Sequence, residues 1–291
     1  MRVEVFDQQP VVTLDPAAKV RRAAMRASAE ARAVGDVPAL LESARVDPDL
    51  MARTDAVRAV GRIDPRGGDT ASRLHDLWSS SDDALREDIA RAYASPNIAA
   101  SGGAEELRLL VASGHGPGAV SAAAFVMMRM KNASDTRTSA IALLVRTIDE
   151  APRRERLLAI AMAPVSEPSI MAAMKRATAE TETLETRVSV WSRLLELAAE
   201  HAKATAALLA FARPGGPELV ARRARLALAS DGDRSVQQWI EADLKTPDAS
   251  TKLLAATALA AMHRGARAAG LLADADPIVR TSVACTLLAH R

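Results

Sequence analysis

Cysteine and aromatic residues are scarce in this chain of 291 residues. The one cysteine, Cys285, excludes an intramolecular disulfide and a metal site built from several thiolates. It lies in an apolar stretch, and we expect it to be a small core residue, as free cysteines usually are. Aromatic side chains make up 2% of the sequence, so few rings are present for stacking on nucleic-acid bases.

Motifs for catalysis and cofactor binding are also missing. The five histidines are never spaced four residues apart, and no His-Glu-x-x-His stretch occurs. The sequence contains no Gly-x-Gly-x-x-Gly or Gly-Lys-Ser/Thr phosphate loop and no Gly-x-Ser-x-Gly elbow. We therefore expect a protein that is not an enzyme, with no cofactor and no metal site.

Long apolar runs are absent as well. No stretch approaches the roughly 20 apolar residues of a membrane span, and the first residues lack the apolar core of a secretory signal. We expect a cytoplasmic protein, or a periplasmic one if the chain is a domain excised from a longer protein. The 38 basic and 36 acidic residues leave a net charge of +2, which predicts a mixed surface and disfavours a dedicated nucleic-acid binder.

The chain does contain a repeated pair of opposite charges. An acid is followed by a base four residues later, and the second members fall at 53, 86, 120, 154, 187, 222, 252 and 280, so that most steps are 33 to 35 residues. Thr183/Arg187 keeps only the base, and Gly116/Val120 keeps only the phase. The complete pairs are Asp49/Arg53, Asp82/Arg86, Glu150/Arg154, Glu218/Arg222, Asp248/Lys252 and Asp276/Arg280. A period of this length is typical of stacked-repeat proteins.

Each repeat is predicted to hold two helices, because Ala and Leu are abundant and apolar residues recur at helical spacing. The second helix of each repeat begins at an acid, threonine or proline that suits a first turn. The expected starts are Pro48, Asp82, Gly118, Pro152, Thr183, Pro217, Pro247 and Pro277. The expected first helices are 36–44, 70–79, 104–112, 135–148, 168–179, 202–211, 234–244 and 266–273.

The chain is predicted to divide into residues 1–35, an N-terminal extension with a basic capping helix, and residues 36–291, the repeat array. Val3–Val5 and Val11–Leu14 are the only strand-like stretches. The basic helix keeps the acid/base spacing, which suggests a degenerate second helix that caps the array.

These repeats resemble HEAT repeats. The resemblance is carried by Asp276-Pro-Ile-Val-Arg280, by Asp82-Asp-Ala-Leu-Arg86 and by Asp49-Leu-Met-Ala-Arg53, each followed by small and apolar residues. It implies an all-α fold, a right-handed α-α superhelix (solenoid) of about eight helix pairs with the second helices on the concave side. It also implies a scaffold that binds a protein partner. In such arrays the acid/base pairs join neighbouring repeats, which makes a structural ladder of Asp49, Arg53, Asp82, Arg86, Arg187, Asp276 and Arg280.

Two arginine clusters are the candidate binding residues, and they favour an acidic segment of the partner. Trp191 is a candidate apolar anchor if it is exposed. The clusters comprise Arg153, Arg154 and Arg156, and Arg222, Arg223 and Arg225.

Two other functions stay open. Some HEAT-like proteins are alkylpurine DNA glycosylases that hold DNA on a basic concave face, and the arginine clusters would then contact phosphates. Nucleic-acid binding is disfavoured because the expected second helices carry 19 basic and 14 acidic residues, a weak surplus. Chromophore lyases of the same fold are supported by fold analogy alone.

Overall fold

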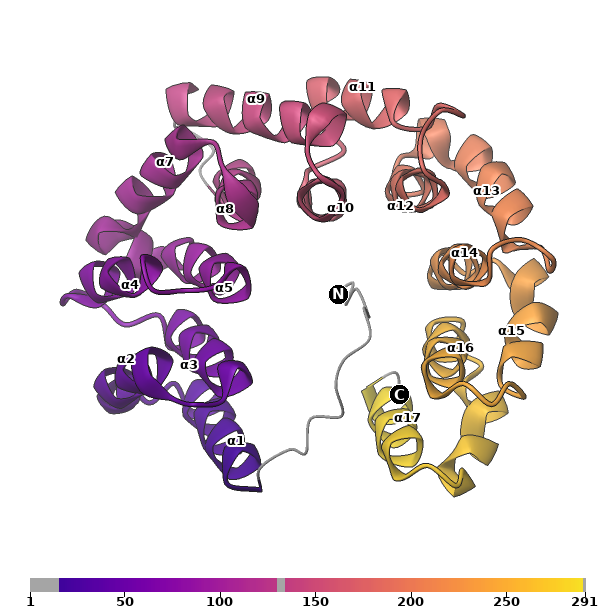
Figure 1. Ribbon diagram of the computed structural model, residues 1–291, viewed down its shortest axis with the longest axis horizontal. Coiled ribbons are helices and arrows are strands. Elements are labelled where there is room, and N and C mark those ends of the chain that lie inside the picture. Colours follow the sequence, from indigo (N-terminus) through magenta and orange to yellow (C-terminus); the bar gives the residue numbers. More distant parts are fainter. Residues whose placement is uncertain (1–15, 130–133, 290–291) are drawn as a thin grey trace. The chain divides into compact units, whose positions relative to one another are not determined.

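The computed structural model describes residues 16–129 and 134–289 (Figure 1). These residues form α-helices joined by turns and short 3-10 or π segments, without a strand among them, so the predicted all-α class is confirmed. Val3–Val5 and Val11–Leu14 lie outside the described residues. Within the described ranges, no helix is both long enough and apolar enough to cross a membrane.

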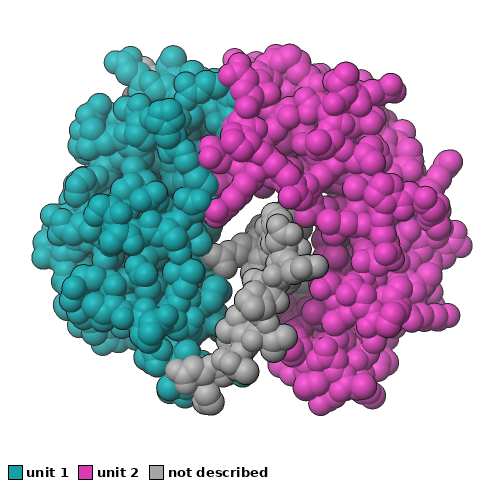
Figure 2. Space-filling model, in the orientation of Figure 1, with its two compact units in different colours: residues 1–147 teal, residues 148–291 magenta. Residues whose placement is uncertain are grey.

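Two compact units divide the chain at α9 (Ser134–Glu150), and Figure 2 shows them in separate colours. Unit 1 comprises residues 1–147 and unit 2 comprises residues 148–291.

Unit 1 consists of a leading helix and three helical hairpins. Its helices before α9 are α1 (Pro16–Ala31), α2 (Val37–Val46), α3 (Leu50–Ile63), α4 (Thr70–Trp78), α5 (Asp83–Tyr93), α6 (Pro96–Ile98), α7 (Ala104–Ser113) and α8 (Gly116–Arg129). A π segment, Ala99–Gly103, leads from α6 into α7, and a 3-10 turn, Val34–Asp36, precedes α2. In Figure 1, α3, α5 and α8 lie on one side of this unit, and α2, α4 and α7 lie on the other.

The second helices of unit 1 pack on one another in chain order. Helix α1 contacts α3, α3 contacts α5, and α5 contacts α8. Small residues allow this close approach, since Ala56, Ala90 and Ala123 are fully buried between helices. The leading helix therefore packs on α3 in the same layer as the second helices.

Unit 2 repeats the same arrangement with other helices. They are α10 (Arg153–Met162), α11 (Pro168–Arg176), α12 (Leu184–Leu194), α13 (Ala198–Ala212), α14 (Glu218–Ser230), α15 (Gln237–Asp243), α16 (Ala249–Ala261) and α17 (Pro277–Ala289). Helices α10, α12, α14, α16 and α17 contact each other in this order. Two 3-10 segments complete the unit. Arg234–Val236 precedes α15, and Gly265–Ala273 stands where the first helix of the final repeat is expected.

The predicted positions of the second helices are confirmed, because each one begins within two residues of its predicted start. The cause is visible at Asp49, Asp82, Thr183 and Asp248. Their side chains accept hydrogen bonds from free amides of the first helical turn. The right-handed superhelix and the division into residues 1–35 and 36–291 stay predictions.

The third repeat has a steric restriction at the start of its second helix. A side-chain carbon at Gly118 would overlap the indole ring of Trp78, which lies against the start of α8. Arg86 covers the same indole, with its guanidinium carbon 5.7 Å from the ring centre. Position 118 is therefore restricted to glycine as long as Trp78 keeps this place, whereas position 116 is open, and nothing in the structure explains the missing charged pair at Gly116/Val120.

Candidate functional site

Two of the predicted acid/base pairs, Asp49/Arg53 and Asp82/Arg86, contact other partners than each other. Asp49 and Asp82 cap their helices, while the bases four residues later turn back to the preceding helix. The Arg53 Nε donates to the Ala44 carbonyl oxygen at 2.9 Å, and the Arg86 Nε donates to the Trp78 carbonyl oxygen at 3.2 Å. These arginines therefore neutralise the C-terminus of the first helix in their own hairpin.

The remaining ladder residues behave in related ways. Arg280 donates to the carbonyl oxygens of Asp274 and Ala275, and Asp276 caps α17 at Ile278. Arg187 stacks on Phe211, with its guanidinium carbon 5.2 Å from the ring centre. Arg222 makes both kinds of predicted ion pair, the pair within a repeat and the pair between neighbouring repeats. It pairs with Glu218 four residues earlier and with Asp248 of the following repeat.

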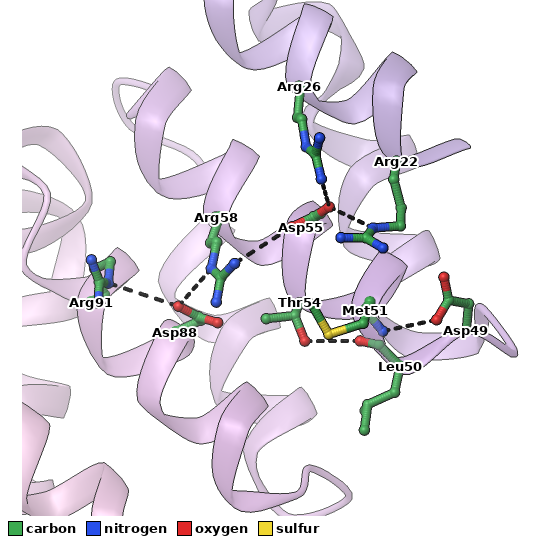
Figure 3. A network of polar contacts seen from close by, with 10 residues as sticks. All are labelled: Arg22, Arg26, Asp49, Leu50, Met51, Thr54, Asp55, Arg58, Asp88 and Arg91. Carbon is green, nitrogen blue, oxygen red and sulfur yellow. Dashed lines mark hydrogen bonds and ion pairs between the residues drawn. The ribbon is translucent and has the colours of Figure 1, made fainter. Parts of the chain in front are cut away.

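A different set of charges joins the second helices of unit 1, and we call it the charge ladder (Figure 3). Asp55 on α3 accepts from two arginines of α1, with 2.9 Å to Nε of Arg22 and 3.1 Å to Nη2 of Arg26. Arg58 then links α3 to α5, since its Nε lies 3.0 Å from Asp88 and its Nη1 lies 3.5 Å from Asp55. Arg91 completes the ladder with its Nε 3.7 Å from Asp88.

The carboxylates of the charge ladder are buried and the outer guanidiniums are exposed. The side chains of Asp55 and Asp88 are 7% and 3% exposed, whereas those of Arg26 and Arg91 are each 62% exposed. Burial raises the pKa of Asp88 above its ordinary value, and the hydrogen bond from Arg58 only partly opposes this effect. The ladder thus holds its acids inside the helix layer and presents its bases to solvent.

Phe125 ends the charge ladder at α8. The guanidinium carbon of Arg91 lies 5.6 Å from the centre of the Phe125 ring, a cation–π contact. This ladder is not among the contacts predicted from the sequence, although the sequence contains a signal for it. Asp55-Ala-Val-Arg58 and Asp88-Ile-Ala-Arg91 are the same pattern, 33 residues apart.

The two predicted arginine clusters meet in unit 2 on a shared carboxylate. Glu185 of α12 lies 2.5 Å from Nε of Arg153 on α10 and also pairs with Arg223 on α14. Burial acts to raise the pKa of Glu185, but the hydrogen bonds from Arg153 and Arg223 outweigh it and lower the pKa below its ordinary value.

The other cluster residues are also engaged within the chain. Arg156 binds both carboxylate oxygens of Glu182, at 2.7 and 2.8 Å. Arg225 is buried and donates to the Ala212 carbonyl oxygen and to Asp243. Arg154 is exposed on the first turn of α10. The predicted binding clusters are therefore largely occupied by carboxylates of this chain.

Charge balance separates the two networks. In unit 2, six cations pair with six carboxylates: Arg153, Arg156, Arg222, Arg223, Arg225 and Lys252 with Glu182, Glu185, Glu218, Asp243, Asp248 and Asp274. In the charge ladder of unit 1, four arginines share two aspartates. The ladder therefore has a surplus of positive charge that the unit 2 network lacks.

Two expectations about single residues are wrong. Trp191 is buried, with Lys203 over its ring, so it cannot serve as an exposed anchor. Cys285 is exposed on α17 and is not a core residue. Its neighbours on the chain are apolar, but the helix turns that position outward, which the sequence around it did not reveal.

Neither metal ligands nor a catalytic pocket marks an active site among the described residues. Within them, no group of three or more His, Cys, Asp or Glu side chains is placed to hold a metal ion. A pocket of about 220 Å³ lies between α2 and α4, and its lining includes Leu41, Leu77, Glu42 and Arg45. Glu42 and Arg45 pair with each other along α2, and the hydroxyl of Ser80 in the lining donates to the Leu77 carbonyl oxygen at 3.2 Å, so neither group forms a nucleophile–base pair.

Comparisons with known proteins give a structural likeness only. No family model matches the chain, and no curated protein matches it. The chain is similar to the crystal structure of an engineered protein determined by the Northeast Structural Genomics Consortium, with 20% sequence identity and a TM-score of 0.35. That match covers 95% of this chain and 86% of the engineered one. A function must therefore be inferred from the residues of this chain.

Proposed function

We propose that this protein is a non-enzymatic scaffold of HEAT-like repeats that binds a protein partner through its second helices. Support for the HEAT-like repeat comes from the contacts shared by the hairpins. An acid caps the start of the second helix, and an arginine of that helix donates to a carbonyl oxygen at the end of the first helix. Support for binding comes from the outward faces of the second helices. In unit 1, Arg26, Arg62, Arg91 and Met128 on these helices are exposed.

The observation that carries the proposal is the arrangement of the second helices. They contact one another in chain order within each unit, so side chains from several repeats share one continuous layer. Distributed contacts over such a layer suit an extended partner, as in other repeat proteins. The layer offers many weak contacts in place of a single deep cavity.

The balanced charges of unit 2 favour a protein partner over DNA. A duplex-binding surface needs several cations that are available to phosphates. In the two arginine clusters, most guanidiniums already contact carboxylates of the same chain. A glycosylase-like role would therefore require these pairs to break before phosphates could bind.

The test is affinity capture from a lysate of the source cells at near-physiological salt, with and without nuclease treatment. The captured protein is then purified and added back to the chain, and hydrogen exchange is measured on the complex. We expect a partner retained in both lysates and protection on second helices such as α3, α5, α12 and α14. Binding that disappears with nuclease, or protection confined to first helices such as α2 and α13, would contradict the proposal.

A further inference from the structure

We propose that the charge ladder of unit 1 binds an acidic, extended peptide segment whose carboxylates lie above Asp55 and Asp88. This inference rests on the proposed scaffold function and names the site and the chemistry of the partner. The segment would run across α1, α3 and α5, along the row formed by Arg26, Arg58 and Arg91 (Figure 3).

A surplus of positive charge is the first argument. Four guanidiniums on two carboxylates leave two positive charges, and a ladder that served packing alone would need only matched pairs. Three further carboxylates lie on the same helices: Glu30, which pairs with Arg62, and Asp83 and Glu87 on α5. Counted over the whole of α1, α3 and α5, nine basic residues still exceed five acidic ones.

The exposed donors are the second argument. Arg26 uses Nη2 to reach Asp55, and Arg91 uses Nε to reach Asp88. Each guanidinium has five N–H donors, and both side chains are mostly exposed, so donors remain directed to solvent. The buried aspartates hold the guanidiniums in place before a partner arrives, which reduces the entropy lost on binding.

The spacing of the row sets the form of the partner. Arg26 and Arg58 converge on Asp55, and Arg58 and Arg91 converge on Asp88, so the row offers two adjacent positions for a carboxylate. Packed helices lie about 8–10 Å apart, which sets the distance between these positions. An extended segment of the polyproline II type rises about 3.1 Å per residue with three residues per turn, so acidic residues three apart lie on one face and match the row.

A carboxylate suits the row better than a nucleic-acid phosphate. Asp55 and Asp88 lie next to the guanidiniums and repel any anion, so the ladder's surplus of two charges suits a segment with one carboxylate every third residue better than a phosphate chain with a charge on every nucleotide. The Phe125 ring beside the row is covered by Arg91 and is not open for a base to stack on.

The experiment measures binding of the full chain to a fluorescein-labelled peptide of 12 residues with Glu at every third position and Ser or Thr between. A second peptide has the same composition with its four Glu residues adjacent. At about 50 mM salt, we expect the spaced peptide to bind several-fold more tightly than the clustered one. Fluorescence anisotropy gives both dissociation constants.

Matched double variants test the location. Arg26→Gln with Arg91→Gln removes the two exposed guanidiniums and leaves Arg22 and Arg58 to neutralise the aspartates. We expect it to weaken binding by about tenfold, the effect of losing two exposed charge contacts. Arg45→Gln with Arg108→Gln makes the same charge change on exposed residues of α2 and α7, and should change binding less than about twofold. Circular dichroism verifies that both variants fold.

Three outcomes would overturn the inference. The first is an equal loss in both double variants, which would indicate non-specific attraction by net charge. The second is absence of peptide binding at 50 mM salt. If a partner were still captured from lysate, the scaffold function would stand and only the acidic site would fail. The third is tighter binding of a 12-nucleotide oligothymidine that depends on Arg26 and Arg91, which would assign the row to phosphates.

Discussion

The two units hold their second helices together with charges, but they distribute those charges differently. Unit 1 buries Asp55 and Asp88 within the layer and covers them with four arginines. In unit 2, the six cations of the network around the arginine clusters are matched by six carboxylates, and Glu185 on α12 pairs with Arg153 on α10 and Arg223 on α14. The difference shows that one repeat pattern can give a network with a surplus of positive charge or a network with matched charges.

The difference in burial explains why the pKa values of Asp88 and Glu185 are shifted in opposite directions. Asp88 lies where desolvation dominates, and its pKa is raised. Glu185 is more accessible, and two guanidiniums lower its pKa despite partial burial. The carboxylates of unit 1 therefore depend more on their arginines, since a buried charge without a partner is costly.

The largest expected effect comes from removing the central acid of each network. Asp55→Asn leaves Arg22, Arg26 and Arg58 close together without their shared anion, and we expect it to lower the free energy of unfolding by about 3 kcal/mol. Glu185→Gln should cost only about 1 kcal/mol, because the Arg153 side chain is well exposed and can turn to water. Urea unfolding followed by circular dichroism measures both. Equal costs would show that burial does not distinguish the networks.

A smaller effect is expected at two residues with left-handed backbone. Asp64 after α3 and His263 after α16 have φ values of 51° and 56°, a region that favours glycine. The Asp64 carboxylate also accepts from the amides of Asn97 and Ile98 at 2.9 and 3.1 Å, whereas the described residues provide no hydrogen-bond partner for the His263 side chain.

Glycine at these two positions should therefore act in opposite directions. His263→Gly relieves the backbone and should stabilise the protein by about 0.5–1 kcal/mol. Asp64→Gly relieves the same strain but loses the link to the next repeat, and should destabilise it by about 1–2 kcal/mol. Thermal unfolding of both variants and of the wild type measures the sign and size of each stability change. Stabilisation by both would mean that the Asp64 hydrogen bonds contribute nothing.

The smallest expected effect is on the pH dependence of stability. The destabilisation caused by removing Glu185 in unit 2 and by removing Asp88 in unit 1 should change with pH in opposite directions. Glu185 has a folded pKa below its ordinary 4.5, so it stabilises the protein above about pH 4.5, and this contribution is lost as the pH falls through the lowered pKa. The cost of Glu185→Gln should therefore shrink on acidification.

Asp88 has a folded pKa above its ordinary 3.8, so the wild type gains stability from this group as the pH falls through the raised pKa towards 3.8. The cost of Asp88→Asn should therefore grow on acidification. Urea unfolding of wild type and both variants between pH 7 and pH 3.5 gives the two slopes. Slopes of the same sign would contradict the contrast between the units.

The sequence predicted the helices well because their starts are local. Asp82 and Thr183 cap the amides directly after them, and no distant residue is needed for that bond. The predicted ladder was less accurate because its arginines have a choice of acceptors. Arg53 and Arg86 reach carbonyl oxygens of the preceding helix, which become available only when the hairpin closes.

The candidate site was hard to predict for a related reason. Arg153 and Arg223 were identified as candidates for binding a partner, but both contact Glu185, and that arrangement depends on how α10, α12 and α14 pack. Asp55 and Asp88 were visible as a repeated pattern, yet burial within the layer is what gives them their role. Patterns in sequence located charges, whereas packing decided which of them were neutralised.

Gly118 limits how far the repeats of this chain can be exchanged. The hairpins have nearly the same length, and it is tempting to treat them as modules that could be deleted, duplicated or shuffled. The indole of Trp78 occupies the space that any side chain at position 118 would need. A hairpin with Asp or Ala at that position could not follow α4 and α5 without displacing the tryptophan. The order of these repeats is therefore part of the fold, and their equal length does not make them interchangeable.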